Sequence, residues 1–419
     1  MRRRNFLCLA VCVALLGLAA TNIRPVAAAE PTEVIHWWTS GGESAALKVL
    51  VQAFTADGGI WVDSPVATGD AAKTVARTRL FGGEPPQAMM WQPGRQLLAM
   101  AGEGVLADLT PVAVAGNWDG VLPPLLQAAI KLDGKYYAVP TDIHGLNWLW
   151  ASKAVFDKIG APVPTTWEAF NQLAPKIKAA GYIPLALGGQ AWQETLLFFD
   201  VALGVGGEDY YRRAFVQQDQ AALDSDTLVA IFSQFKKLKE WVDPASQGRD
   251  WNLTANLIMS DKAALFIMGD WAKGEFVNAG KVPGKDYICQ LAPGTADTYL
   301  FSADVWAMPR GKQGNTLSDG QKLLAEVMMK PALQEKLSLV KGSIPPRSDV
   351  PTDKFDACAQ VAIHQVTRNQ DHMLPAADVA LPSAVVQAIT DTATQFFNSD
   401  TTPAMGATQL RKAIEQAAD

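Results

Sequence analysis

Few side chains in this sequence are spaced for catalysis or metal binding. The four histidines lie far apart, with no second histidine four residues away and no adjacent cysteine, so we expect no metal site. There is no Gly-x-Ser-x-Gly string and no glycine-rich phosphate loop, which argues against a covalent hydrolase and a nucleotide cofactor. Any two of the 42 acidic residues could still converge as the carboxylate pair of a glycosidase, so that class stays open.

Tryptophan is frequent in this sequence, with 13 residues in the chain. Several adjoin glycine, proline, glutamine or charged residues at expected element ends: Trp37, Trp38, Trp91, Trp192, Trp251, Trp271 and Trp306. A rigid aromatic face with one N–H donor suits stacking on the C–H face of a sugar ring. The alternative is core packing, which we expect for about half of the tryptophans, including Trp167 and Trp241 on helix faces.

The first elements of the chain predict an α/β fold. A buried strand over 33–38 runs through a glycine turn into a helix over 43–55, which places Trp37 and Trp38 at the carboxyl end of the strand. Further predicted strands cover 135–140, 146–151 and 262–268, and helices cover 163–181, 226–242 and 322–340. In the helix over 163–181, Thr165 and Glu168 form a capping box and Pro175 predicts a kink. A break is expected at Pro331.

Length and composition indicate two lobes. The chain has 419 residues and 49% apolar residues, more than one hydrophobic core normally holds. No low-complexity linker separates the halves, so we expect the chain to cross between the lobes more than once. Small ligands commonly bind at such boundaries.

The N-terminus predicts export. Residues 1–29 combine three early arginines, an apolar run and Ala27-Ala28-Ala29, the pattern of a cleaved signal peptide; the Sec and twin-arginine routes both stay open. All four arginines of that segment are lost on cleavage, which leaves 32 basic against 42 acidic residues, a net charge of −10. This excludes nucleic acid as an expected partner, and we predict a periplasmic protein without membrane insertion.

Two cysteines, Cys289 and Cys358, remain after cleavage. An even pair in an oxidising compartment favours a disulfide, and two separately buried thiols are the alternative.

Five strings, in order along the chain, resemble the glucose-binding branch of the extracellular solute-binding proteins (family 1) of ABC sugar importers. They are His36-Trp37-Trp38-Thr39-Ser40-Gly41-Gly42-Glu43, Asn147-Trp148-Leu149-Trp150, Gly188-Gly189-Gln190-Ala191-Trp192-Gln193, Gly248-Arg249-Asp250-Trp251-Asn252 and Met268-Gly269-Asp270-Trp271-Ala272-Lys273. The cysteines of the KDYIC and FDAC strings also resemble the family's disulfide pair.

The resemblance implies a two-lobed periplasmic binding protein fold, type II-like, with three hinge crossings and the ligand in the interlobe cleft. The N-terminal lobe would take residues 30–141 plus 304–343, and the C-terminal lobe 142–303 plus 344–419. The hinges would lie near Thr141-Asp142, Ala303-Asp304 and 342–346.

The resemblance also implies site residues. Trp37 and Trp38 would stack on or edge the sugar, Glu43 and Asp304 would accept from its hydroxyls, and Lys341 would donate to them. Trp251 and Trp271 would form the opposite wall, and His144 lies beside the first crossing in the same expected site.

Three positions depart from the family pattern. Gln92 stands where a Lys or His is expected, Asp142 replaces an asparagine, and the loop over 374–380 carries Val379 or a neighbour where a histidine is expected. Each lost rim donor would leave a hexose hydroxyl unpaired, at a cost of roughly 1 to 3 kcal/mol. The identity of the sugar therefore stays open.

The predicted function is that of a periplasmic substrate-binding protein, not an enzyme. It would bind a mono- or short oligosaccharide by hinge closure, as a monomer, and deliver it to the membrane permease of an ABC importer. The alternatives are a secreted carbohydrate-active enzyme with Glu43 and Asp304 as acid and base, and a binder of an altered, less polar ligand.

Overall fold

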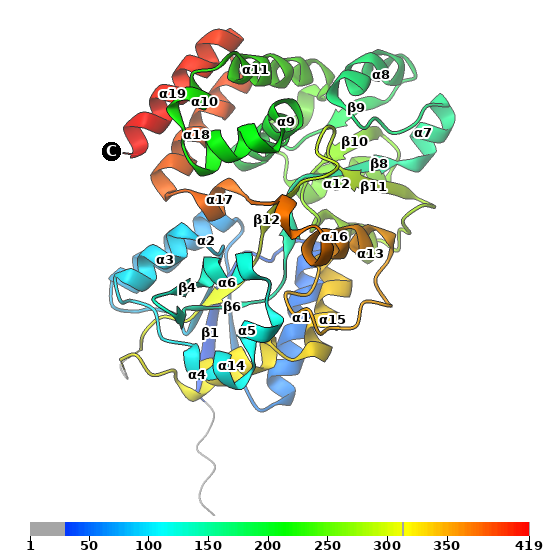
Figure 1. The fold of residues 1–419 in the computed structure, drawn as a ribbon. Helices are drawn as coiled ribbons and strands as arrows, with labels where there is room; N and C mark the ends of the chain where they lie inside the picture. Colours follow the sequence, from blue (N-terminus) through cyan, green and yellow to red (C-terminus); the bar gives the residue numbers. More distant parts are fainter. Residues whose placement is uncertain (1–29, 312–313, 419) are drawn as a thin grey trace, which may run out of the picture.

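The molecule consists of two bodies, each built around its own β-sheet (Figure 1). The structure is a computed structural model that describes residues 30–311 and 314–418. Helices pack around both sheets, so the predicted α/β class is confirmed. The predicted signal peptide lies outside the described residues.

The first sheet has five strands in the spatial order β2, β1, β3, β13, β6. Their bounds are Ile60–Pro65, Pro31–His36, Ala88–Trp91, Val305–Ala307 and Ala138–Pro140. β1 runs parallel to β2 and β3, whereas β13 is antiparallel to β3 and β6. The helices of this body are α1 (Gly41–Ala56), α2 (Gly69–Phe81), α3 (Arg95–Gly102), α4 (Thr110–Ala115), α5 (Trp118–Val121), α6 (Pro124–Ile130), α14 (Asp319–Met328) and α15 (Pro331–Lys341). A small hairpin joins β4 (Lys131–Leu132) and β5 (Lys135–Tyr136).

The start of α1 is fixed by its sequence. Ser40 caps the helix, and its hydroxyl accepts from the Glu43 backbone N–H at 3.3 Å while the Glu43 carboxylate accepts in return from the Ser40 N–H at 3.2 Å. One face of the helix, which includes Leu50 and Phe54, is buried against the core. The predicted helix over 43–55 is thus confirmed, two residues longer at its start.

The second sheet has the order β11, β8, β10, β9. Their bounds are Tyr287–Leu291, Trp148–Ser152, Ala263–Ile267 and Ile183–Ala186. β9 and β10 are parallel, and β8 is antiparallel to both β10 and β11. The helices of this body are α7 (Lys153–Ile159), α8 (Trp167–Ala179), α9 (Ala191–Tyr211), α10 (Gln220–Leu223), α11 (Asp226–Leu238), α12 (Trp251–Met259), α13 (Ala272–Asn278), α16 (Ala357–Arg368), α17 (Ala377–Ala380), α18 (Ser383–Phe397) and α19 (Pro403–Ala418).

Some predicted elements differ from the structure. Helix α8 continues through Pro175, where the proline removes one backbone hydrogen bond. The helix is capped by Thr166 and not by the predicted Thr165. The strand over 135–140 divides into β5 and β6. The predicted break at Pro331 is confirmed, since α14 ends at Met328 and α15 begins at Pro331.

The chain passes between the two bodies at three places that lie side by side. The Thr141 N–H donates to the Asp304 carbonyl at 2.9 Å, and Ile143 forms a β-bridge with Ile344. A third sheet continues from there, in the order β14 (Met373–Pro375), β12 (Tyr299–Ser302), β7 (His144–Gly145). The predicted crossings thus converge, whereas the exact lobe boundaries stay a prediction.

The disulfide between Cys289 and Cys358 is present, with the two Cα atoms 5.9 Å apart. It joins β11 to α16, so it links the second sheet to a helix that follows the third crossing. The alternative of two free thiols is excluded for this structure.

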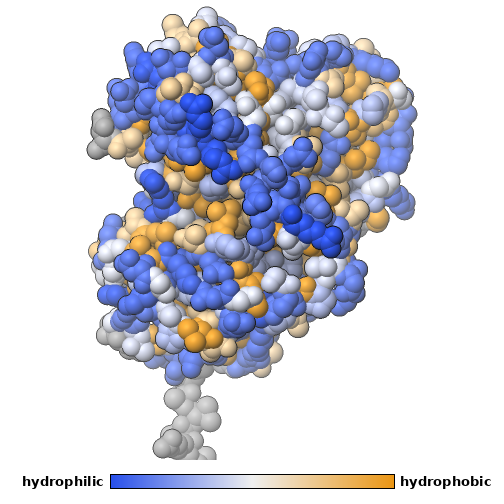
Figure 2. All heavy atoms as spheres, in the orientation of Figure 1, coloured by the Kyte–Doolittle hydropathy of each residue, from blue (hydrophilic) through white to orange (hydrophobic). Residues whose placement is uncertain are grey.

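Within the described residues, no helix combines the length and the apolar character that a bilayer span requires. Figure 2 shows hydrophilic residues over much of the visible face, with hydrophobic residues gathered at the waist between the upper and lower bodies.

Candidate functional site

The side chain of Asp142 joins all three crossings. One carboxylate oxygen, Oδ1, accepts from the Asp304 backbone N–H at 2.9 Å, and the other, Oδ2, accepts from the Ser343 hydroxyl at 3.4 Å. Asp142 is completely buried. Its carboxylate therefore serves to hold the crossings together, and its oxygens face protein groups.

His144 lies at the centre of a buried cluster of carboxylates. Its Nδ1 atom is 2.5 Å from Asp270 Oδ1, and its Nε2 atom is 3.3 Å from Asp142 Oδ2 and 3.4 Å from Asp304 Oδ2. Burial lowers the pKa of His144, but the charges of Asp142 and Asp270 raise it more, so the pKa lies well above its usual range.

Three ligand atoms of this cluster, from Asp142, His144 and Asp304, lie within 4.8 Å of one another, a spacing that a metal ion could bridge. Both ring nitrogens of His144 already face carboxylate oxygens. The expectation of no metal site stays a prediction.

The first body contributes Trp38 and Glu43 to the same place. Trp38 donates from Nε1 to Asp304 Oδ2 at 2.8 Å, although the two residues are 266 positions apart. The Glu43 Oε2 atom accepts from the Thr39 and Ser40 N–H groups, which orients the carboxylate at the start of α1. Burial raises the pKa of Glu43 more than the nearby Lys341 lowers it.

Lys341, the last residue of α15, brings a positive charge to this group. Its ammonium lies 5.2 Å from the Trp38 ring centroid, and it is almost fully buried. Burial lowers the pKa of Lys341, but the charges of Glu43 and Asp304 raise it above its usual value. Among the described residues no carboxylate oxygen lies within 4.0 Å of the ammonium, which instead lies beside the Trp38 ring.

Asp304 balances these cations. Burial raises its pKa, but the hydrogen bond and charge of His144 lower it more, and Lys341 adds to this effect, so the net direction is downward. An ionised carboxylate flanked by a cation, an indole N–H and a second carboxyl group is suited to bind the hydroxyl groups of a small polar molecule.

Two further aromatic rings follow His144 in the second body. Trp271 meets the His144 ring edge-on at 5.3 Å, and Trp192 lies 6.4 Å from Trp271. Both tryptophans are half-buried, so part of each ring is open. The Trp271 ring folds over Gly269, where any side chain would collide with it.

The structure brings together six predicted site residues: Trp38, Glu43, Asp142, His144, Asp304 and Lys341, with Trp271 against His144. Three others lie outside this network of contacts. Trp37 packs on Gly69 at the start of α2, Gln92 follows β3, and Trp251 begins α12; the latter two are half-buried.

Two tryptophans from the sequence pattern are core residues. Trp91 and Trp306 are buried in β3 and β13, paired strands at the middle of the first sheet. Conversely, Asp270 and Ser343 are part of the cluster and the sequence analysis did not select them. Asp270 belongs to the string that supplied Trp271, which is the signal that could have indicated it.

The two bodies touch through glycine backbones beside the cluster. The Gly42 N–H in α1 donates to Glu275 Oε1 in α13 at 2.7 Å. A methyl group on Gly42 would lie 2.5 Å from the Gly274 carbonyl carbon. The close approach of α1 and α13 therefore depends on glycine at position 42.

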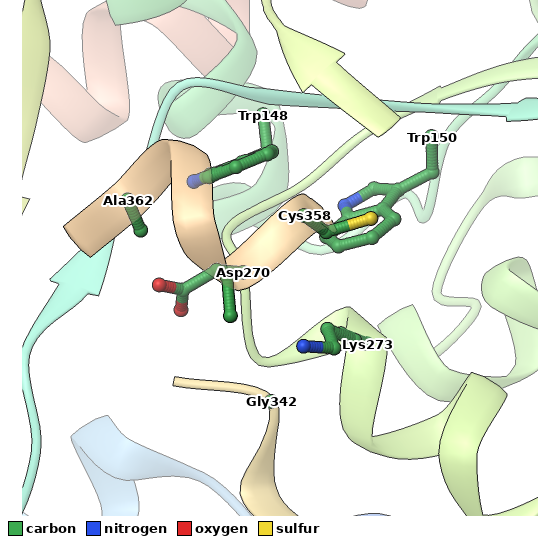
Figure 3. A pocket seen from close by; sticks show the side chains of 8 residues that line it. Trp148, Trp150, Asp270, Lys273, Gly342, Cys358 and Ala362 are labelled. Carbon is green, nitrogen blue, oxygen red and sulfur yellow. The ribbon is translucent and has the colours of Figure 1, made fainter. Parts of the chain in front are cut away.

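Behind Asp270 the packing is tight. Figure 3 shows Asp270 next to the rings of Trp148 and Trp150 and to Cys358, with Lys273 and Gly342 on its other side. The space between these residues leaves essentially no room for a water molecule. Asp270 is therefore supported from behind, and its carboxylate is directed to His144 and to the Gly145 N–H at 3.0 Å.

Comparisons with known proteins identify the family and the fold of this chain. Residues 49–362 match the family described as bacterial extracellular solute-binding protein. A probable sugar-binding periplasmic protein of Rhizobium meliloti (strain 1021) is 42% identical over 97% of this chain and 98% of its own length. A protein with the same description from Brucella suis biovar 1 is 40% identical over 97% of both chains.

Solved structures show the same fold at lower identity. The bacterial solute receptor AcbH, described as having an exclusive preference for β-D-galactopyranose, superposes with a TM-score of 0.79 at 20% identity and covers 93% of this chain and 98% of its own. A chitin oligosaccharide binding protein gives 0.79 at 17% identity, covering 93% and 99%. With the family match over most of the chain and relatives at 40% identity and above, the chain belongs to the bacterial extracellular solute-binding proteins.

Proposed function

We propose that the protein captures a sugar in the cleft between its two bodies and delivers it to the membrane permease of an ABC importer. The main observation behind this proposal is the interlobe group of Trp38, Asp304 and Lys341. In this group a carboxylate and an ammonium lie beside an indole ring. Charged donors and acceptors next to an aromatic face match the alternating hydroxyls and C–H faces of a sugar.

Closure around the ligand is part of the proposal. Trp38, Glu43 and Lys341 belong to one body, and His144, Asp270 and Trp271 to the other, with the three crossings between them. A sugar that contacts both sides would stabilise the closed arrangement by the free energy it gains there and not in the open one. In this arrangement Asp142 acts as a positioning residue for Asp304.

The relatives support the assignment to transport. They are named sugar-binding periplasmic proteins, and a 30% identical relative from Pyrococcus horikoshii is named an ABC transporter extracellular-binding protein. We accordingly place the mature chain in the periplasm, as a monomer that performs no chemistry on its ligand.

The experiment is native mass spectrometry of the purified mature chain, followed by calorimetric titration with a panel of monosaccharides and disaccharides. A retained hexose-based ligand, or saturable binding of at least one sugar with a shift in tryptophan fluorescence, is expected. The absence of any response across the panel would overturn the proposal.

The enzyme alternative is tested in parallel. Glu43 and Asp304 have pKa values shifted in opposite directions, as an acid and base pair would. However, the Glu43 carboxylate is already engaged by two backbone N–H groups at the start of α1. Incubation with the bound oligosaccharide should return it intact, whereas release of shorter sugars would show hydrolysis.

A further inference from the structure

Trp192 and Trp271 both follow the carboxyl ends of neighbouring strands. β9 and β10 run parallel, with Ala186 opposite Phe266, so their carboxyl ends lie at the same edge of the second sheet. Trp192 is the second residue of α9, the helix that follows β9, and Trp271 precedes α13, the helix that follows β10. The edge formed by the carboxyl ends of strands is where α/β sheets hold ligands.

The two rings continue a row that begins at Asp304. His144 lies 3.4 Å from Asp304, Trp271 is 5.3 Å from the His144 ring, and Trp192 is 6.4 Å from Trp271. Trp192 is thus one ring further out than Trp271. Its half-buried side chain gives an open aromatic surface beyond the charged cluster.

Polar side chains surround Trp192 in a fixed arrangement. Its Nε1 atom donates to Gln190 Oε1 at 2.9 Å, and Gln190 donates in turn to Asp250 Oδ1 at 2.5 Å. Gln193 donates to the same Gln190 oxygen at 2.9 Å and to the Arg249 carbonyl at 3.0 Å. Amide and carboxylate groups around a half-buried ring offer donors and acceptors at the edge of a stacking surface.

The loop that carries these groups is held in place by close backbone contacts. Gly189 donates to the Ser246 carbonyl at 2.7 Å, and a methyl group on it would lie 2.5 Å from the Gln247 Cα atom. A methyl group on Gly188 would lie 2.1 Å from Gln193 Oε1. The ring and its polar surround are therefore positioned by the fold rather than by an adaptable loop.

We propose that Trp192, with Gln190 and Asp250, forms a second sugar-ring subsite, so that the preferred ligand is a disaccharide or a longer oligosaccharide. One ring lies between Trp38 and Trp271 with its hydroxyls on Asp304 and Lys341, and the next ring stacks on Trp192. This inference rests on the proposed sugar-binding function and specifies its ligand class.

Calorimetric titrations with D-glucose, D-galactose, maltose, cellobiose, lactose and melibiose test the subsite. At least one disaccharide should bind the wild-type protein roughly tenfold more tightly than its component monosaccharides, because the outer ring adds an aromatic contact. Trp192→Ala should remove that advantage and leave monosaccharide affinity within about twofold, whereas Trp192→Phe should retain part of it.

Trp241→Ala is the matched control, because Trp241 is also half-buried but lies beside Lys178 of α8, and its loss should leave both affinities unchanged. Disaccharides that bind no better than monosaccharides, or equal losses for both classes in Trp192→Ala, would overturn the subsite while leaving sugar binding intact. A wild-type protein that binds none of the six sugars would instead contradict the proposed function.

Discussion

The carboxylate of Asp142 accepts a 2.9 Å hydrogen bond from the backbone N–H of Asp304, so the side chain of one crossing fixes the main chain of another. Asp304 in turn receives the indole N–H of Trp38 from the first body. The orientation of a candidate ligand-binding carboxylate thus depends on a buried residue that does not face the cleft.

The charge of Asp142 should also control the protonation of His144. In Asp142→Asn the acceptor for the Asp304 N–H is kept, but one of the charges that raise the His144 pKa is removed, so that pKa should fall. Proton-coupled NMR titration of the imidazole measures the change. Ser343→Ala, which removes only a neutral partner of Asp142, should leave the His144 pKa nearly unchanged.

The same histidine links stability to pH. Its pKa in the folded state is raised above the unfolded value of about 6.5, so its contribution to stability is complete below that pH and is lost as the pH rises through the folded pKa. Urea unfolding from pH 6 to 10 should show this loss, and it should begin at lower pH in Asp142→Asn. Identical pH profiles for the two proteins would contradict the cluster's electrostatics.

Lys341 should contribute to ligand affinity through its ammonium group. Lys341→Met keeps most of the buried stem and removes a charge-assisted donor, which should weaken sugar binding by about 1.5 to 3 kcal/mol, or roughly 10- to 150-fold. Calorimetry measures the loss. Lys322→Met on the exposed face of α14 is the control and should not change affinity; a Lys341→Met protein with wild-type affinity would remove Lys341 from the site.

Asp200 is a buried acid that should lower stability at neutral pH. Neither carboxylate oxygen has a hydrogen-bond partner, and burial raises its pKa well above the usual range. The carboxyl group and Tyr211 line a small cavity of about 20 Å³. A raised acid pKa costs stability above the unfolded pKa of about 3.9, and the cost grows until the pH reaches the folded pKa.

Asp200→Asn should therefore be more stable than the wild type at pH 7, by about 1 to 3 kcal/mol in the free energy of unfolding, and the difference should shrink toward pH 4. Chemical denaturation at both pH values measures it. Asp226→Asn, at the first residue of α11 on an exposed position, serves as a control without this pH-dependent gain.

The disulfide should contribute substantially to stability. It closes a segment with a sequence separation of 69 residues, for which the chain-entropy model gives about 4 kcal/mol. The Cys289→Ser, Cys358→Ser double variant should lose a comparable free energy of unfolding, and reductant should lower the wild-type melting temperature but not that of the variant. Equal stability of the two proteins would contradict this role.

The glycine contact between α1 and α13 should be required for tight binding. Gly42→Ala places a methyl group against the backbone of Gly274, which cannot move aside as a side chain can. The bodies should then meet less closely, and sugar affinity should fall. The free energy of unfolding without sugar should change little. Small-angle scattering with and without sugar measures closure; Gly102→Ala, where the nearest atom is 3.7 Å away, is the control.

The fold and a large part of the cluster could be predicted from the sequence. Ser40 and Glu43 form a local capping box, so the start of α1 was readable within four residues. By contrast, the pairing of Trp38 with Asp304 spans the chain, and only the family resemblance placed both residues in one site. No local pattern specifies such a contact.

The errors have the same cause. The sequence groups Trp306 with the tryptophans at expected element ends, yet β13 lies between β3 and β6, which buries it on both sides. The role of Asp142 was also hidden, because its partners Asp304 and Ser343 come from the other two crossings. Strand order in a sheet decides such cases, and a single sequence does not state it.

The position of β13 has a consequence for biosynthesis. The first sheet is interrupted between β3 and β6 until residues 305–307 are inserted, and all four strands of the second sheet are encoded before them. Neither body corresponds to one continuous stretch that could mature alone while the rest is still being made. The first sheet therefore stays unfinished until late in synthesis, which makes this fold dependent on slow, long-range assembly.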